Sequence, residues 1–543
     1  MGKMLQDEQL KPLASQIYGS VADLFGQVQD RVGLPLDKIL AIPQGEFCLA
    51  FVPPESGPPA VVILLDAGDQ IPSVTRLLER ATEELEKQGV VRSQEALGDT
   101  LLVQFKPANG PGFTYCIRDG VFLASTNKDV VKQTLNVWNG SPDANWTSLA
   151  DNKKYTAIMS RCSAAGEERP QVTWFVDPIE LFRFGARGNF GAQAALAILP
   201  ALGLDGLQGI GGSLLMGTGD YDVVQHIHLL LDSPRSGVLE LITLKPGDSK
   251  PESWAPAETA TYMTLHWDFA FTYAELTKLI DSFQTDGTVA QFVKQRFEEP
   301  LGVEFQSELI DALEGRVTYL TWFEKSGAIN AQTQMLALKL KDAEAFRKTL
   351  DRVAAKFEQN MEKEAFGGVS YYRIKTPNAE NARRVQVERR DGGIRTQLNL
   401  RAPEPCLFIL GDYFCVADAS SLVRECIATQ SDPDKSLASA LDYKLVASKI
   451  SRQTGGNAPG MIVFNRPEVG LKAIYDLARD EGMRKMLAQQ GENNPFLKSL
   501  DKALQDNPLP PFSVISKYFA PVGGMVTNDE TGFHYMTFGL KRN

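Results

Sequence analysis

The order of apolar and polar positions repeats along the chain. Residues 113–135 read FTYCIRDGVFLASTNKDVVKQTL, and residues 405–427 read PCLFILGDYFCVADASSLVRECI. In each stretch two apolar runs flank a turn that contains Asp-Gly or Gly-Asp, which predicts a β-hairpin. Apolar residues then recur at helical spacing, so each hairpin is expected to lead into a helix.

Polar residues before these two helices predict their N-terminal caps. Thr126 or Asn127 can cap the first helix, and Asp418 can cap the second. The apolar stripes define the sides that we expect to be buried: Val130, Val131, Thr134 and Leu135 in the first helix, and Leu422, Val423, Cys426 and Ile427 in the second.

The same order extends over most of the chain. An apolar strand and a helix with Pro72 in its first turn match an apolar strand and a helix that Asp342 can cap. Further pairs of similar segments are 45–51 with 315–321, 61–65 with 335–340, 96–106 with 365–375, 172–178 with 461–467, and 210–231 with 522–540. Agreement over so many segments predicts an internal duplication.

The predicted fold class is therefore α+β, with two similar halves of mainly antiparallel sheets and helices packed on one face. The predicted domains are a first half at 1–235, a linker at 236–258 that is rich in Pro, Ser and Gly, and a second half at 259–543. The first half lacks a counterpart of the strand and helix expected within 256–282, so we expect it to be incomplete at its N-terminus.

Composition narrows the classes of partner. The 543 residues are 43% hydrophobic and 23% charged, which suits a globular chain of several domains. The net charge of −11, and the lack of any cluster of Lys and Arg set among aromatic residues, argue against nucleic acid and anionic membranes as partners. No signal peptide is visible, because MGKMLQDEQLKPL has charged residues where a signal peptide would need an apolar segment. No transmembrane segment is expected either, because the sequence holds no run of 18 purely apolar residues.

The six cysteines form no CxxC pair, and most of them lie in apolar runs, so we expect small buried hydrophobic residues. Cys406 and Cys415 fall on the two arms of one predicted hairpin. They lie on a diagonal rather than directly opposite, which leaves a disulfide between them open.

The search for catalytic and metal motifs found no P-loop, HExxH, GxSxG, kinase or EF-hand signature, so we expect no cofactor, no metal and no enzyme. His226 and His228 share one face of a predicted strand, but a metal needs a third ligand, and His534 is expected at a different phase. His266 is next to Asp268 in sequence but not on its face, which argues against a Ser-His-Asp relay. The glycines at 209–213 precede a strand rather than a helix and predict a bulge or tight turn.

The stretch at 188–204, GNFGAQAALAILPALGL, departs from the pattern because it has no charged residue. A helix that is apolar all round is expected to be buried, here between the two halves. Alternatively it forms a patch for self-association, a protein partner or a lipid-like ligand. The candidate residues of this patch are Phe190, Leu196, Ile198, Leu199 and Leu202.

The repeated order of glycine-led strand, apolar strand, capped helix and hairpin resembles large bacterial proteins that are catalogued only as a domain of unknown function. This resemblance implies export to the periplasm or cell envelope and a non-catalytic role, although the export signal is absent here. We therefore expect an envelope protein that acts as an interaction or scaffold module. The alternative hypotheses are a carrier for an apolar or lipid-like molecule and, third, a hydrolase with an unorthodox site.

Overall fold

The structure is a computed structural model that describes most of the chain. The described residues are 4, 6–16, 19, 34–53, 59–110, 112–141, 146, 148–163, 168–324, 330–375, 384–387, 396–399, 401–479, 502, 504–507 and 509–542. Within them, antiparallel pairing builds one sheet of 6 strands, one of 13 strands and a two-stranded ribbon of β15 (Arg384–Val387) and β16 (Thr396–Asn399). The predicted α+β class with antiparallel sheets is confirmed.

The smaller sheet lies entirely in the first half. In spatial order its strands are β1 (Phe47–Val52), β2 (Ala60–Asp66), β6 (Val121–Ser125), β5 (Phe113–Arg118), β4 (Thr100–Lys106) and β3 (Val91–Leu97).

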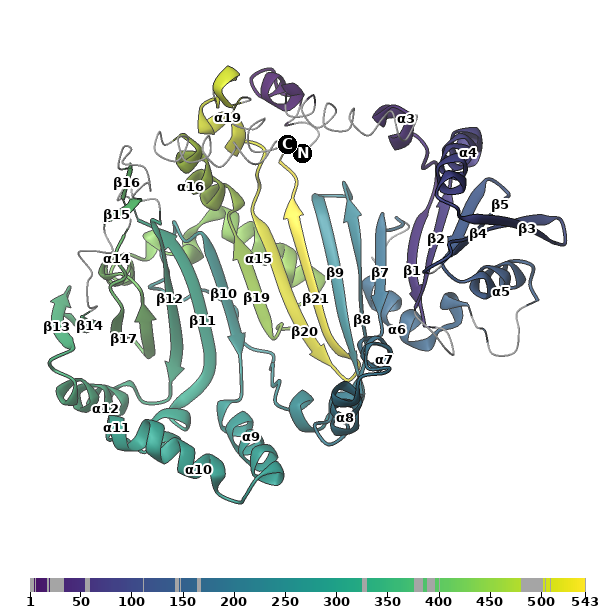
Figure 1. Cartoon of the computed structure of the whole chain (residues 1–543). Coiled ribbons are helices and arrows are strands. Elements are labelled where there is room, and N and C mark those ends of the chain that lie inside the picture. The colour runs from purple at the N-terminus through teal and green to yellow at the C-terminus, as the bar shows by residue number, and fades with distance from the viewer. Residues whose placement is uncertain are drawn as a thin grey trace.

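The larger sheet forms a broad curved wall (Figure 1). In spatial order its strands are β13 (Met361–Phe366), β14 (Val369–Ile374), β17 (Cys406–Leu410), β18 (Tyr413–Ala417), β12 (Gln332–Leu340), β11 (Leu313–Phe323), β10 (Thr261–His266), β19 (Met461–Asn465), β20 (Val522–Asp529), β21 (Gly532–Leu540), β9 (Tyr221–Leu231), β8 (Leu207–Met216) and β7 (Val172–Val176).

The two sheets share one strand order. Numbered along the chain, the smaller sheet runs first, second, sixth, fifth, fourth, third from β1 to β3. The six strands from β11 to β13 of the larger sheet follow the same order. Beyond β11 the larger sheet continues into β10, whereas β1 has no described strand on its other side.

The larger sheet spans the predicted boundary between the halves, because β9 of the first half pairs with β21 of the second. The segment 236–258, predicted as a linker, packs against this sheet and buries Leu239, Glu252 and Trp254. Whether the halves behave as separate domains remains a prediction.

Most of the predicted local structure is confirmed. Asp119 and Gly120 turn the first hairpin with positive φ, and the Asn127 side chain caps α5 (Lys128–Trp138) by accepting from Asp129 N–H. Asp342 caps α12 (Ala343–Lys356) in the same way. The predicted cap at Asp418 is wrong. The N-cap of α14 (Ser420–Gln430) is Ala419, and the Asp418 carboxylate instead accepts from Gln334 N–H and pairs with Arg401.

The prediction of helices on one face is wrong for the smaller sheet. The helix α4 (Ile71–Lys87) packs on the face that carries Phe105 and Tyr115. Helix α5 packs on the opposite face, against Leu102 and Cys116. Both faces of these strands are apolar, so each needs its own cover.

The main core lies on one face of the larger sheet, which we call the covered face and which carries Tyr262 and Phe464. Helix α14 and α15 (Leu441–Gln453) pack on it, and Figure 1 shows them behind the sheet. On the same face α6 (Lys153–Cys162) brings Ile158 against Gly209 and Gly211. These two glycines therefore allow close helix packing within β8, where the register shifts near Gly209, rather than forming a phosphate loop.

All six cysteines are free, and five of them are buried. The expectation of small buried hydrophobic residues is confirmed for these five, while Cys48 is partly exposed. Cys406 pairs with Ala417 and Cys415 with Phe408, so the two thiols do lie on a diagonal of the hairpin, without a disulfide.

Candidate functional site

An apolar row crosses the face of the larger sheet opposite the covered face. We call this the open face. Directly paired residues form the row, one from each of nine strands: Leu338, Val317, Leu265, Met461, Val526, Tyr535, Ile227, Gly212 and Trp174. Because neighbouring strands lie about 4.8 Å apart, the row is about 40 Å long.

A second row lies two residues further along each strand. Its members are Leu336, Tyr319, Met263, Val463, Gly524, Thr537, Gln225, Leu214 and Val172. Thr537 and Gln225 are its polar members, and no residue of either row is charged. Together the two rows form a continuous and mostly apolar surface across the sheet.

Strand alternation shows that this face lacks the cover of the other. In β10 Tyr262 and Thr264 are buried on the covered face, whereas Met263 and Leu265 are only half-buried. Toward the two ends of the rows the exposure rises, to 39% for Leu336 and 47% for Val172. Uncovered apolar side chains at this spacing provide contacts for an apolar partner.

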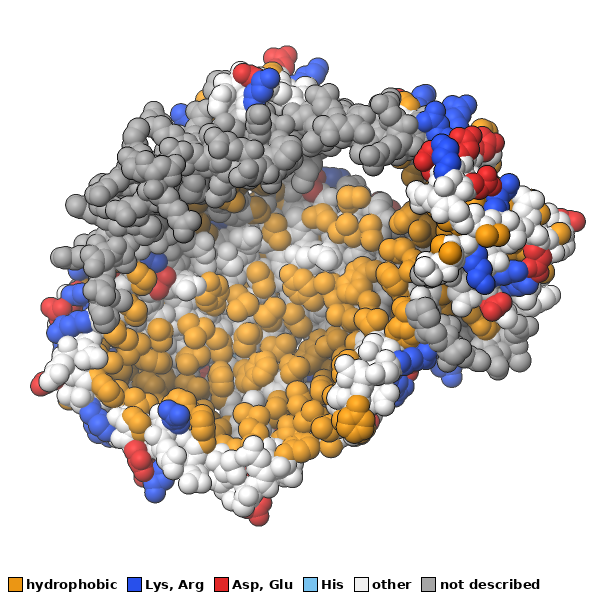
Figure 2. All heavy atoms as spheres, in the orientation of Figure 1, with side chains coloured by type: hydrophobic (Ala, Val, Ile, Leu, Met, Phe, Trp, Pro, Cys, Tyr) orange, Lys and Arg blue, Asp and Glu red, His pale blue; other side chains and the backbone are white. Residues whose placement is uncertain are grey.

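Figure 2 shows the open face as a hollowed surface in which apolar side chains gather, with charged side chains at its periphery. Helix α12 covers the end of this face near β14 and β17, where Phe346 and Leu350 pack with Ile409. On the same face Leu239 packs with Val526 of β20 and Phe533 of β21. Much of the face stays visible beside these two covers (Figure 2).

The predicted patch at 188–204 lies at the rim of this hollow, where Figure 1 shows α8 (Phe190–Ile198). The expectation that this segment is buried between the two halves is wrong, because no residue of α8 is buried. Phe190 is 87% exposed and Ile198 is exposed, while Leu196, Leu199 and Leu202 are half-buried. The candidate residues thus provide an apolar surface beside the open face.

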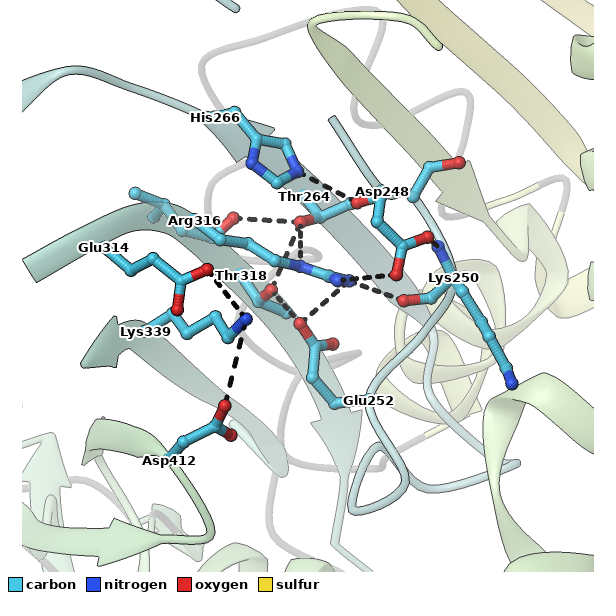
Figure 3. Close-up of polar contacts among 12 residues, drawn as sticks. Asp248, Lys250, Glu252, Thr264, His266, Glu314, Arg316, Thr318, Lys339 and Asp412 are labelled. Carbon is cyan, nitrogen blue, oxygen red and sulfur yellow. Dashed lines mark hydrogen bonds and ion pairs between the residues drawn. The ribbon is translucent and has the colours of Figure 1, made fainter. Parts of the chain in front are cut away.

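A buried polar network lies on the covered face (Figure 3). The Glu252 carboxylate comes from the 236–258 segment, and its Oε1 lies 3.0 Å from Nη2 of Arg316 on β11. The same carboxylate accepts from Tyr262 Oη at 2.9 Å and from Thr318 Oγ1 at 2.6 Å. Arg316 also donates to the carbonyl of Lys250 and to Thr264.

This network links the 236–258 segment to the sheet, because Glu252 and the Lys250 carbonyl of the segment bind Arg316, Tyr262 and Thr318 of the strands. Burial opposes the charge of Arg316, but the Glu252 carboxylate and two tyrosines outweigh it, so the pKa of Arg316 rises above its usual value. Burial, reinforced by Glu252, raises the pKa of Tyr262 well above its usual value. A closed network of this kind stabilises structure and leaves no group poised for proton transfer.

Three histidines meet on the covered face beneath α6. His534 pairs directly with His228 across β21 and β9, and its Nε2 lies 3.1 Å from Nδ1 of His226. The expectation that His534 lies at a different phase is therefore wrong. The register of β9 against β21, one strand from each half, brings the three rings together. A sequence pattern within one strand does not reveal this register.

Burial lowers the pKa of all three imidazoles, and for His534 the neighbouring His226 and His228 lower it further, to about 3. Neither ring nitrogen of His228 has a hydrogen-bond partner among the described residues. Within that part of the chain no group of His, Cys, Asp and Glu side chains has an arrangement that could hold a metal ion. The lowered pKa values favour neutral imidazoles, and His226 and His228 are buried while His534 is half-buried.

His266 does not form a relay with Asp268. Its Nε2 lies 2.9 Å from the carbonyl oxygen of Asp248. Asp268 caps α9 (Phe269–Phe283) by accepting from Phe271 N–H, and it pairs with Lys245. Both side chains therefore have structural partners.

Comparison of the chain with protein-family models, with curated proteins and with solved structures gave no match. Across the described residues no helix combines the length and apolar character that crossing a bilayer requires. The geometry of the larger sheet is therefore the main indication of function.

The open face itself was missed at the level of sequence, although a signal for it exists. Strands such as β10 (TYMTLH) and β19 (MIVFN) have apolar residues at both odd and even positions. Strands of this kind need cover on both faces. Counting the helices that could cover them would have predicted a sheet with one face short of cover.

Proposed function

We propose that the chain binds an apolar, lipid-like molecule in the hollow of the open face. The observation that carries this proposal is the uncharged row that runs from Leu338 to Trp174 across nine strands. Backbone groups in the middle of a sheet already bond to neighbouring strands, so this face offers side-chain contact alone. Such contact suits a hydrocarbon chain, which has no hydrogen bonds to satisfy.

Binding of an environment-sensitive fluorescent fatty acid by the full chain tests this proposal. Leu336→Glu and Val463→Glu each place a charge on the open face, and we expect both to weaken binding at least roughly tenfold. Leu441→Glu is the matched control, because Leu441 is 82% exposed at the start of α15, on the other side of the sheet. Equal binding by all these variants would contradict a site on the open face.

Native lipid extraction followed by mass spectrometry provides a second test. Protein purified without detergent is expected to retain an apolar molecule at a fixed ratio. A preparation of the folded protein that binds neither native lipid nor the probe would rule out the carrier function.

We also propose that the two halves are copies of one ancestral unit. The shared strand order supports this origin, as do α4 and α12, which occupy the same place between the second and third strands of each set. The interaction or scaffold function remains a second proposal, which the edges of β1 and β7 favour, since neither edge has a partner strand among the described residues. Export to a cell envelope stays a prediction, which fractionation of native cells tests.

A further inference from the structure

In the first half, the edges of β1 and β7 have no partner strand in the part of the chain that the structure describes. In the second half, the two corresponding edges share one strand. In the larger sheet β10 lies between β11 and β19 and pairs antiparallel with both. By strand order β1 corresponds to β11. Similarly β7 corresponds to β19. The strands β8 and β9 follow β7, the strands β20 and β21 follow β19, and β9 pairs with β21. Among the described residues β1 pairs with β2 alone and β7 with β8 alone.

Backbone hydrogen bonds show which groups of β1 face the open edge. Asp66 N–H donates to the carbonyl of Glu46, and Val61 N–H donates to Thr126 on the far side of β2. Antiparallel pairs alternate between bonded and non-bonded positions. The N–H and C=O groups of Phe47, Leu49 and Phe51 therefore point away from β2.

The corresponding groups of β11 are the ones that bind β10. Counted from the glycine before each strand, Phe47, Leu49 and Phe51 match Val317, Tyr319 and Thr321. Those three residues pair with Leu265, Met263 and Thr261 of β10. The bond from Trp267 N–H to the Gly315 carbonyl has the same phase, so β1 presents the bonding pattern that β11 uses.

The side chains of β1 leave this edge unprotected. Phe47 is 59% exposed, Leu49 52% and Phe51 64%. The strand FCLAFV contains no charged residue and no proline. Native proteins normally blunt an exposed edge with Lys, Pro or a bulge, and an apolar edge without them is a template for another strand.

We propose that β1 and β7 are docking edges that accept an extended segment of a partner polypeptide between them, antiparallel to both. The partner strand has the character of β10, in which apolar side chains reach both faces and every backbone group bonds to one edge or the other. Recognition by strand addition draws its affinity from main-chain hydrogen bonds and its specificity from alternate side chains. This inference goes beyond ligand binding and depends only on the strand order and the edge geometry.

The probe for this test is a fluorescent synthetic peptide with the sequence of residues 259–268, TATYMTLHWD. We expect it to bind the full chain in fluorescence anisotropy and to slow hydrogen exchange of the Phe47, Leu49 and Phe51 amides. Exchange in β11 should stay unchanged, since β10 already occupies that edge. Absence of binding, or protection elsewhere, would overturn the proposal.

Two variants of one residue separate backbone pairing from side-chain contact. Leu49→Pro removes an N–H that faces the edge, and an edge strand tolerates proline at such a position. It should weaken the peptide roughly tenfold or more, whereas Leu49→Ala, which keeps the N–H, should cost less. Equal affinity of the two variants would overturn the proposal.

Leu49→Pro could weaken binding by disturbing the fold of the protein. N-methylated peptides test the same hydrogen bonds with the wild-type protein. N-methylation at the position of Met263 removes the donor toward β1, and at Thr264 the donor toward β7. Each methylated peptide should bind roughly tenfold more weakly or worse, and binding that survives both changes would refute strand addition. Native mass spectrometry tests a further alternative, in which the wild type is a dimer and Leu49→Pro is a monomer. That result would show that a second copy of the chain occupies the edge, and it would refute binding of a separate partner.

Discussion

Glu252 Oε1 lies 3.0 Å from Arg316 Nη2, and the two side chains are only 4% and 8% exposed. Glu252 belongs to the 236–258 segment, and Arg316 belongs to β11, an interior strand of the larger sheet. Their pairing turns a stretch rich in proline and glycine into a part of the core. It also explains why Trp254 and Ala255, close to Glu252 in sequence, are buried.

Removal of one partner of this pair should destabilise the fold strongly. Glu252→Ala leaves the Arg316 charge buried without compensation, which costs about 3–5 kcal/mol. Asp248 also approaches Arg316, at 3.5 Å, but its side chain is 71% exposed, so Asp248→Asn should cost less than about 1 kcal/mol. Urea unfolding followed by tryptophan fluorescence measures the free energy of unfolding of both variants. Equal losses in the two variants would show that burial of the carboxylate does not set the strength of its interaction with Arg316.

Simultaneous replacement of both charges should restore much of the loss. Glu252→Leu combined with Arg316→Met removes the buried charges together, and such replacements are often neutral or stabilising. Tyr262 and Thr318 would lose a hydrogen-bond acceptor, so we expect recovery to within about 2 kcal/mol of the wild type. A double variant as unstable as Glu252→Ala would show that hydrogen bonds, not charge, dominate the network.

The three histidines should make the fold sensitive to acid. Burial and mutual repulsion hold the pKa of His534 at about 3 against an unfolded value of 6.5, so the unfolded chain binds protons that the folded chain cannot. This contribution to stability is intact above pH 6.5 and is lost progressively as the pH falls toward 3. Arg161 adds to the repulsion, while Asp529 opposes it.

At pH 5 the loss from His534 alone is about 2 kcal/mol relative to pH 7.5. His534→Gln should therefore show a smaller difference in free energy of unfolding between these two pH values than the wild type. His266→Gln, outside the cluster, is the control and should behave as the wild type does. An unchanged pH dependence in His534→Gln would mean that carboxylates cause the acid sensitivity.

One cysteine, Cys48, should react with a thiol reagent in the native protein, whereas the five buried cysteines should not. Burial raises the pKa of Cys116 and Cys162 to about 11 and that of Cys406 to about 12, which leaves little thiolate near neutral pH. Only Cys48 is partly exposed, and burial also raises its pKa. A chromogenic disulfide reagent should therefore modify one thiol slowly in the native protein and all six after unfolding. Fast reaction of a second thiol would show local opening of the core.

The apolar rim of the hollow should matter for binding but not for folding. Phe190→Glu changes a side chain that is 87% exposed, so we expect the free energy of unfolding to change by less than about 0.5 kcal/mol. Binding of the fluorescent fatty acid should weaken, because a charge is placed beside the open face. Leu181→Glu, at a residue that is 59% exposed on α7 (Pro178–Gly185), tests whether any charge near this site suffices.

Most of the local structure follows from short-range patterns in the amino-acid sequence. The hairpin at Asp119-Gly120, the caps at Asn127 and Asp342 and the buried stripe of α5 follow from backbone preferences and periodicity within a few residues. The repeated order of segments also led to antiparallel α+β architecture, because hairpin links are short.

Which strands pair with one another depends on contacts between distant parts of the chain. Pairing of β9 with β21 joins the two halves in one sheet and places His534 opposite His228. The same pairing carries the apolar row without interruption from Leu338 to Trp174. Partner and register are properties of strands far apart in the chain, and a shift of one residue would exchange the two faces. No local pattern fixes them, because their free energy comes from contacts that exist only once the sheet has assembled.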